Sequence, residues 1–218
     1  MRQDSMNQIT ITGDGVSLDG ILRIPDHATG VVAFAHGSGS GRFSPRNQYV
    51  ARVLETGGLA TLLLDLLTAD EADDRRQVFN IDLLTDRLLL AQTWLATHRP
   101  TSGLRAGYFG ASTGAAAALQ AAARRPQAVD AVVSRGGRPD LAGPYLSRVT
   151  APTLLLVGGD DGPVIDMNEE ALAQLTCEKQ LIIIPGASHL FEEPGTLEQV
   201  AREALHWFER HLSPASSA

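Results

Sequence analysis

The sequence contains one cysteine, Cys177, so the chain cannot form an intrachain disulfide and its fold does not depend on an oxidising compartment. It also lacks a run of about 18 apolar residues that could span a bilayer, and residues 1–10 lack the apolar core of a secretory signal. Basic residues are few, because 18 Lys and Arg face 25 Asp and Glu, a formal charge of −7. We therefore expect a cytoplasmic protein with no nucleic-acid partner and no membrane partner, since both need a basic face.

Metal-binding and nucleotide-binding motifs are also missing. No pair of His or Cys residues has the spacing of metal ligands, so we expect no metal site. The glycine-rich segment 37–42 lacks the sixth-position glycine of a dinucleotide-binding fingerprint, and it lacks the lysine and hydroxyl of a phosphate-binding loop. We therefore expect a protein that works without a cofactor.

The sequence does contain a regular alternation of short apolar runs with helical patterns. The predicted strands are 9–12, 18–24, 30–35, 59–65, 104–109, 131–134, 153–157 and 180–184. The predicted helices are 47–56, 82–98, one after residue 112 that stops at 124–126, 169–175, and 196–211 with Thr196 as its cap. This alternation predicts an α/β fold with a mostly parallel central sheet of about eight strands and helices on both faces. No linker or repeat is visible, so we expect a single domain over residues 1–218, with 213–218 as a frayed tail.

The segment Gly110-Ala111-Ser112-Thr113-Gly114 lies between a predicted strand and the small-residue run 115–123. It predicts a tight strand-to-helix turn whose strained backbone pushes the Ser112 hydroxyl out of the sheet. The glycines on either side let the strand and the helix approach closely. Ser112 is therefore the candidate nucleophile, at the carboxyl end of a strand, where sites in such sheets lie.

A serine nucleophile needs a base, because a neutral hydroxyl is barely reactive. His189 lies between the last predicted strand and the last predicted helix, so its loop can bring the imidazole over Ser112. The base needs a carboxylate that fixes its tautomer, and Asp161 follows the preceding strand. The chain order Ser, Asp, His is the one expected for this architecture. Asp160 and Asp140 stay open as alternative acids.

Acyl transfer places negative charge on the carbonyl oxygen, which two backbone N–H groups must meet. We expect one donor from Thr113, directly after the nucleophile, and the other from the glycine-rich turn after the strand 30–35, at Ser38. His36 precedes that turn, and we expect it to tether the turn and border the substrate rather than to transfer protons.

With these residues in this order, the sequence resembles the α/β-hydrolase superfamily, and within it the small lidless proteins related to dienelactone hydrolase. The resemblance runs from the His-Gly turn at 36–37 through the final predicted helix. It implies the α/β-hydrolase fold without a large cap domain, and as site residues the triad Ser112, Asp161 and His189 with oxyanion donors Ser38 and Thr113. The family's acid lies three residues after the first glycine of its loop, Gly158, which favours Asp161 over Asp160. Dienelactone hydrolase itself has a cysteine where this chain has Ser112, so its lactone substrate is not carried over.

Two arginines flank the glycine pair 136–137 that follows the strand after the nucleophile's helix. Arg135 and Arg138 are candidates to bind a substrate carboxylate, which a guanidinium holds with two hydrogen bonds. The alternative is that they form salt bridges with nearby acids, including those of the run 70–74, which is typical of a solvated loop. Candidate walls of an apolar acyl pocket are Phe191, Leu66, Leu67 and Phe79.

The expected function is hydrolysis of a small-molecule carboxylic ester through a Ser-His-Asp triad and an acyl-enzyme. Because no long insertion interrupts the second half of the chain, we expect an open site that favours short acyl groups. Two alternatives stay open: an acyltransferase that uses the same triad, and a non-catalytic protein of the same fold that binds a small ligand or a partner protein. The sequence does not decide between a monomer and a homodimer.

Overall fold

An antiparallel hairpin begins the sheet. In the computed structural model, which describes residues 7–213, β1 (Asn7–Gly13) pairs with β2 (Val16–Arg23), and Gly13 lies opposite Val16. Asp14 and Gly15 form the turn with φ values of 50° and 75°, the positive pair that a two-residue hairpin loop requires. The strands predicted at 9–12 and 18–24 are therefore confirmed, and they pair as a hairpin.

Within residues 7–213 the sheet has eight strands in the order β1-β2-β4-β3-β5-β6-β7-β8. The other strands are β3 (Gly30–Ala35), β4 (Leu59–Leu64), β5 (Arg105–Ala111), β6 (Ala131–Arg135), β7 (Thr153–Gly158) and β8 (Lys179–Ile184). From β4 to β8 all pairings are parallel, so the carboxyl ends of these strands meet at one edge of the sheet. The mostly parallel sheet of about eight strands is confirmed.

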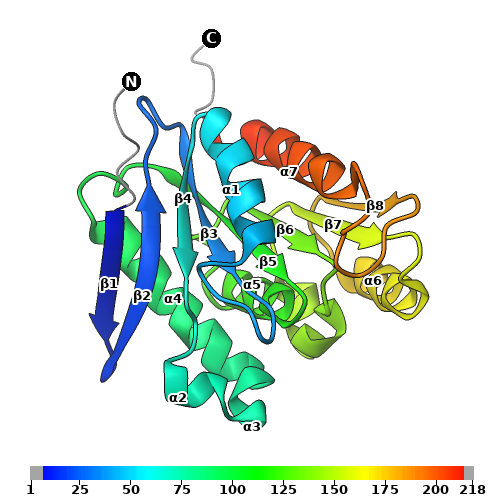
Figure 1. Ribbon diagram of the computed structural model, residues 1–218, viewed down its shortest axis with the longest axis horizontal. Coiled ribbons are helices and arrows are strands. Elements are labelled where there is room, and N and C mark those ends of the chain that lie inside the picture. The colour runs from blue at the N-terminus through cyan, green and yellow to red at the C-terminus, as the bar shows by residue number, and fades with distance from the viewer. Residues whose placement is uncertain (1–6, 214–218) are drawn as a thin grey trace.

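Helices cover both faces of the sheet, as Figure 1 shows. The helices α1 (Pro45–Thr56) and α7 (Thr196–Leu212) lie in front of the sheet in that view, and the opposite face is covered by α4 (Ile81–Thr97), α5 (Thr113–Arg124) and α6 (Gly162–Gln174). Strands β3, β4 and β7 are buried along their whole length, which explains their mainly apolar sequences. Each face of the sheet thus has its own apolar core.

The helices predicted at 47–56 and 169–175 begin earlier than expected, at Pro45 and Gly162, and the cap of the last helix differs from the prediction. The first turn of α6, the helix predicted at 169–175, contains Pro163, and proline is tolerated there because the first N–H groups of a helix have no partner within the helix. The N-cap of α7 is Gly195 in the left-handed conformation, whereas the predicted cap, Thr196, is already helical and donates its hydroxyl to the Glu193 carbonyl at 2.7 Å.

Two segments predicted as irregular contain helical turns. The acidic run 70–74 was expected to be a solvated loop, but it belongs to α2 (Ala69–Ala72), which Thr68 caps, and to the turn before α3 (Arg75–Val78). The segment between β6 and β7 forms η1 (Pro139–Arg148), a 3₁₀ helix interrupted at Gly143. Since η1 is all that separates these strands, no large cap domain covers the carboxyl edge within the described residues.

Parts of two predictions lie outside the described residues, namely residues 1–6 of the segment 1–10 and residues 214–218 of the expected tail. Among the helices of residues 7–213, none has the length and apolar character needed to cross a membrane.

Candidate active site

Ser112 lies between β5 and α5 on a strained turn, with φ 50° and ψ −121°. Backbone hydrogen bonds hold the turn on both sides, because the Ser112 N–H donates to the Arg135 carbonyl at 3.3 Å and its carbonyl accepts from the Arg138 N–H at 3.1 Å. A Cβ on Gly114 would come within 2.1 Å of the Ala35 carbonyl oxygen, so only glycine lets α5 start this close to β3. The serine side chain is partly exposed at the carboxyl edge of the sheet.

His189 and Asp161 form a direct pair at the same edge. The imidazole Nδ1 lies 2.6 Å from Asp161 Oδ2, and the side chains of the histidine and the acid are 39% and 13% exposed. A carboxylate only accepts, so Nδ1 carries the proton and Nε2 is left as the acceptor nitrogen. This tautomer is the one that a histidine base needs.

The two alternative acids lie elsewhere. Asp160 is exposed, and its backbone N–H donates to the Ala187 carbonyl at 2.9 Å. Asp140 accepts two hydrogen bonds from the Arg138 guanidinium, at 2.9 and 2.8 Å. Of the three acids considered, the structure brings only Asp161 to the ring of His189.

The loops that carry Asp161 and His189 are packed against each other. A Cβ on Gly158 would lie 2.3 Å from the Ala187 carbonyl oxygen and 2.7 Å from that of Ser188. The hydrogen bond from Asp160 to Ala187 joins the same two loops. The acid and the histidine are thus positioned by backbone contact as well as by their own hydrogen bond.

The glycine-rich turn 37–41 lies beside the serine. A Cβ on Gly37 would come within 2.9 Å of Ser112 Cβ, which places the start of the turn directly against the nucleophile's side chain. Ser38 is exposed on this turn and lines the same pocket as Ser112, and Thr113 is the first residue of α5, directly after the serine. Arg42, at the other end of the turn, is held by the Asp65 carboxylate through its backbone N–H and its guanidinium.

His36 tethers the turn from inside. Its Nε2 accepts from the Leu66 N–H at 2.9 Å, and because a backbone N–H only donates, Nδ1 carries the proton and donates to the Gly37 carbonyl at 2.9 Å. The side chain is 6% exposed, and burial lowers the pKa of the imidazole. A neutral histidine therefore joins the end of β4 to the turn.

A pocket of about 170 Å³ opens over the serine. Its walls include Ser112, His189, Ser38, Arg135 and Arg46. A second pocket, of about 330 Å³, shares the turn 37–40 and contains Thr113, with apolar walls formed by Leu67, Val78 and Leu84. The turn that carries Ser38 therefore separates a polar compartment from a more apolar one.

The predicted substrate residues lie in different places. Arg135 lines the first pocket, whereas Arg138 is paired with Asp140. Phe191 is buried in the core with its ring 5.8 Å from the Arg135 guanidinium carbon. Of the other expected walls, Leu67 lines the second pocket, Leu66 is fully buried and Phe79 is exposed.

Within residues 7–213, neither Arg135 nor Arg138 forms a salt bridge with the acidic run 70–74. In that run Glu71 pairs with Arg87 and Asp74 with Arg76, and the partner of Arg138 is Asp140. Sequence reasoning also missed Arg46 as a wall of the first pocket. The predicted helix 47–56 begins after Arg46, whereas α1 begins at Pro45 and contains Arg46 in its first turn, an unfavourable position for a cation. Within residues 7–213, no cluster of three His, Cys, Asp or Glu side chains is arranged to hold a metal ion.

Comparison with known proteins shows which family and which fold the chain resembles. The model of the Dienelactone hydrolase family matches residues 18–213. A dienelactone hydrolase from Anabaena variabilis ATCC 29413, known from a crystal structure, is 58% identical with a TM-score of 0.91, over 94% of this chain and 97% of that one. The fold is also that of XC6422 from Xanthomonas campestris, described as an a/b serine hydrolase without lid, at 24% identity and a TM-score of 0.76 over 96% and 95% of the two chains.

A Mycobacterium tuberculosis protein that carries the provisional name of a phosphoribosyl transferase is 55% identical over 205 residues. The matched segment is 94% of this chain and 46% of that protein. The chain thus spans about half the length of the curated relatives it matches.

Proposed function

The chain belongs to the dienelactone hydrolase family, and from this we propose that it is a serine hydrolase that cleaves small carboxylic esters through an acyl-enzyme. The observation that carries the proposal is the 2.6 Å pair of His189 and Asp161 at the pocket that Ser112 lines. A strained serine with an oriented histidine beside it is the arrangement that nucleophilic acyl transfer needs.

The first half of the reaction forms the acyl-enzyme. The Ser112 oxygen attacks the ester carbonyl carbon while His189 Nε2 takes the hydroxyl proton, and Asp161 stabilises the imidazolium that results. The carbonyl oxygen becomes negative and accepts from the N–H groups of Thr113 and Ser38. The intermediate then collapses, the bond to the leaving oxygen breaks, and His189 returns the proton to the departing alcohol.

The second half uses the same groups with water as the nucleophile. His189 takes a proton from a water molecule, whose oxygen attacks the acyl carbon bound to Ser112. The second tetrahedral intermediate is held by the same two N–H groups, and its collapse releases the acid and restores the serine. Each proton thus passes through one imidazole nitrogen, which explains why the tautomer fixed by Asp161 matters in both halves.

The size of the pocket supports a small substrate. At about 170 Å³ the pocket over Ser112 is small. No cap domain covers the edge within the described residues, and the apolar walls of the second pocket lie on the other side of the turn 37–40. We therefore propose short acyl groups as the preferred substrates.

The transferase name of the mycobacterial relative is not extended to this chain. That name describes a protein of which this chain spans 46%. The glycine-rich turn 37–41 has no lysine to bind phosphates, and it packs against the nucleophile through Gly37. We base the proposed reaction on the family and on the three residues at the pocket instead.

Labelling with a fluorophosphonate tests the proposal without knowledge of the natural substrate. We expect one adduct on Ser112 by peptide mass, and none on Ser112→Ala or His189→Ala. Hydrolysis of p-nitrophenyl acetate is expected to fall to background in the same variants, with acetate rather than a transferred ester as product when alcohols are added. An unlabelled Ser112 in the folded protein, or full esterase turnover by Ser112→Ala, would refute the assignment.

A further inference from the structure

Arg135 is a buried cation that no acidic side chain of residues 7–213 neutralises. The residue is 8% exposed. Its guanidinium makes one long hydrogen bond, from Nη2 to Asn47 Oδ1 at 3.5 Å, and the buried Nε has no partner. Burial lowers the pKa of this guanidinium to about 10. An unpaired buried charge is unfavourable for folding, so its retention in a pocket needs a reason beyond the fold.

The other arginines at this edge of the sheet are neutralised. Arg138, two residues past the end of β6, donates both of its fork nitrogens to Asp140. Arg42 is paired with Asp65 and lies 3.3 Å from Asp19. The isolation of Arg135 is therefore particular to its position beside Ser112.

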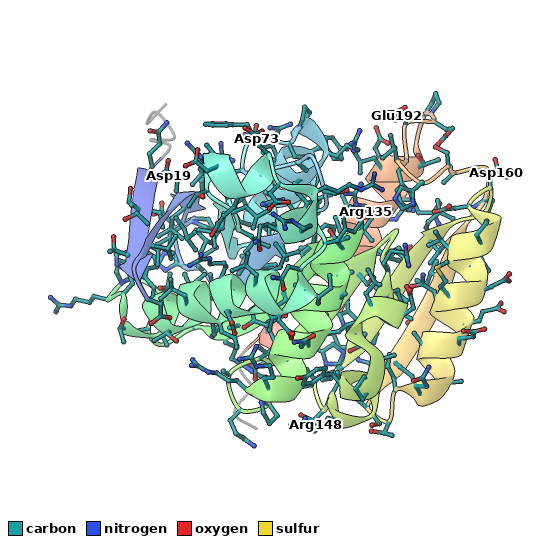
Figure 2. The ribbon with its side chains drawn as sticks, turned by 90° about the horizontal axis from the view of Figure 1, so that it is seen from below. Asp19, Asp73, Arg135, Arg148, Asp160 and Glu192 are labelled. Atoms are coloured by element: carbon teal, nitrogen blue, oxygen red, sulfur yellow. The ribbon has the colours of Figure 1, made fainter. Side chains whose placement is uncertain are left out.

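A second guanidinium lines the same pocket. Arg46 lies in the first turn of α1, which contains no acidic residue, and its carboxylate partner is Glu192 at 3.3 Å. The Glu192 side chain is 64% exposed, so solvent screens this pair strongly. Figure 2 shows Arg135 toward the interior and Glu192 at the periphery of the molecule.

The amino end of α1 adds to the positive potential of the pocket. Ser44 caps the helix, and its hydroxyl accepts from the Asn47 N–H at 3.4 Å. The amino end of a helix attracts anions, and a cation such as Arg46 is unfavourable there unless an anion joins them. The pocket thus has the positive charge of two guanidinium groups and of one helix end, which is more than Glu192 can neutralise. It also has several hydroxyls that can form hydrogen bonds.

We propose that this pocket is an anion subsite, and that the substrate of the proposed hydrolase carries a carboxylate or phosphate group that binds Arg135 and Arg46. This inference rests on the proposed ester hydrolysis at Ser112. Because the pocket is small, the anionic group lies a few bonds from the scissile carbonyl. The apolar part of the substrate then extends past Ser38 into the second pocket.

The proposal is tested with matched methyl esters in a pH-stat: methyl pentanoate, monomethyl succinate and methyl 3-phosphonopropanoate. We expect kcat/KM for at least one anionic ester to exceed that for the neutral ester by about 10–100-fold, the range of hydrogen bonds to charged groups. The better of the two anions identifies the natural group as a carboxylate or a phosphate. Equal kcat/KM values for all three esters would overturn the proposal.

Variants assign the preference to the subsite. Arg135→Met is expected to lose most of the anionic preference, measured as the ratio of kcat/KM for the anionic ester to kcat/KM for methyl pentanoate. Arg46→Gln, at a half-exposed position, should lose part of it, and it serves if Arg135→Met does not fold. Arg52→Gln, an exposed arginine on the same helix, is the matched control and should keep the preference. A preference that survives Arg135→Met and Arg46→Gln but disappears in Arg138→Gln would overturn the assignment.

A binding measurement tests the anion subsite independently of the proposed hydrolysis. Succinate and inorganic phosphate are titrated calorimetrically into Ser112→Ala, which needs no catalysis. Binding that is weakened about tenfold or more by an added Arg135→Met supports the subsite even if the protein hydrolyses none of the esters. Absence of binding by either anion, in a protein whose Ser112 reacts with fluorophosphonate, overturns the subsite and leaves the hydrolase intact.

The melting temperature gives a further readout that a structural role would not produce. Without ligand, Arg135→Met should melt at or above the temperature of the parent protein, because an unpaired buried charge is removed. The better anion should raise the melting temperature of the parent and leave that of Arg135→Met unchanged. A clearly lower melting temperature of Arg135→Met, with its ester preference intact, would show that the guanidinium serves the fold and would overturn the proposal.

Discussion

Asp161→Asn is the sharpest test of how the histidine works. The substitution keeps the shape of the side chain and removes its charge. If the amide NH₂ faces His189, Nδ1 must accept, the proton moves to Nε2, and the ring can no longer take a proton from Ser112. If the amide oxygen faces the ring, the tautomer survives but the imidazolium loses its counter-charge. Both arrangements slow the reaction.

The size of the loss follows from the 2.6 Å separation of Nδ1 and Oδ2. At an effective dielectric constant of about 20, two unit charges at this distance attract by about 6 kcal/mol. The ring is 39% exposed, so solvent reduces that figure. We expect kcat to fall by about 10³–10⁴-fold, which corresponds to about 4–5.4 kcal/mol of transition-state stabilisation.

The neighbouring acid provides the matched control. Asp160→Asn removes the same charge one residue away, but this side chain is exposed and only its backbone N–H contacts the histidine loop. Its kcat on p-nitrophenyl acetate should stay within about twofold of the parent, and both variants should keep their circular dichroism spectra. The assigned roles of these two acids are wrong if Asp161→Asn keeps more than a tenth of the parent kcat, or if Asp160→Asn loses more of the parent kcat than Asp161→Asn does.

Three further predictions concern the turns and the pocket. Gly114→Ala should destabilise the fold by about 3 kcal/mol and lower Tm by about 6–12 °C, because its Cβ would meet the Ala35 carbonyl at 2.1 Å, whereas Gly103→Ala, with open space around it, should change Tm little. Since burial lowers the pKa of His36, the unfolded state binds more protons, so the free energy of unfolding should fall as pH drops below about 6.5 toward the lowered pKa. Urea titrations of His36→Gln should show a weaker fall, and identical curves would refute the role of this histidine. Initial rates on p-nitrophenyl esters should decline from acetate to octanoate, and a steady rise along that series would exclude the small pocket as the acyl site.

Much of the fold is visible in the sequence because the sheet is buried on both faces. A mainly apolar run as short as 59–64 is typical of a strand that helices cover on both sides, and the chain also carries regular helical patterns between such runs. The errors arose where a local signal has two physical meanings. Glycine and proline at 162–163 indicate a loop, but the first turn of a helix tolerates both.

Part of the candidate site could likewise be predicted from the sequence, and part could not. The residues alone left Asp160 and Asp140 open as acids, and the position three residues after Gly158 favoured Asp161 only through the resemblance to the family; Asp161 is the acid that faces His189. The isolation of Arg135 is different, because it depends on where every acid of the surrounding elements lies. The acids 71 and 74, which the sequence offered as partners, are used by Arg87 and Arg76. No pattern within one segment contains that information.

The close packing of the loops at Gly158 and Ala187 has a consequence for how the chemistry can vary. The pair of Asp161 and His189, which we propose to transfer protons, is assembled by contacts that do not involve the turn of Ser112. The reacting atom at position 112 is therefore interchangeable in principle, because exchanging oxygen for sulfur there leaves the partner unit in place. The nucleophile can therefore change without a change in the acid and the histidine, so enzymes with different nucleophiles can use the same acid–base pair.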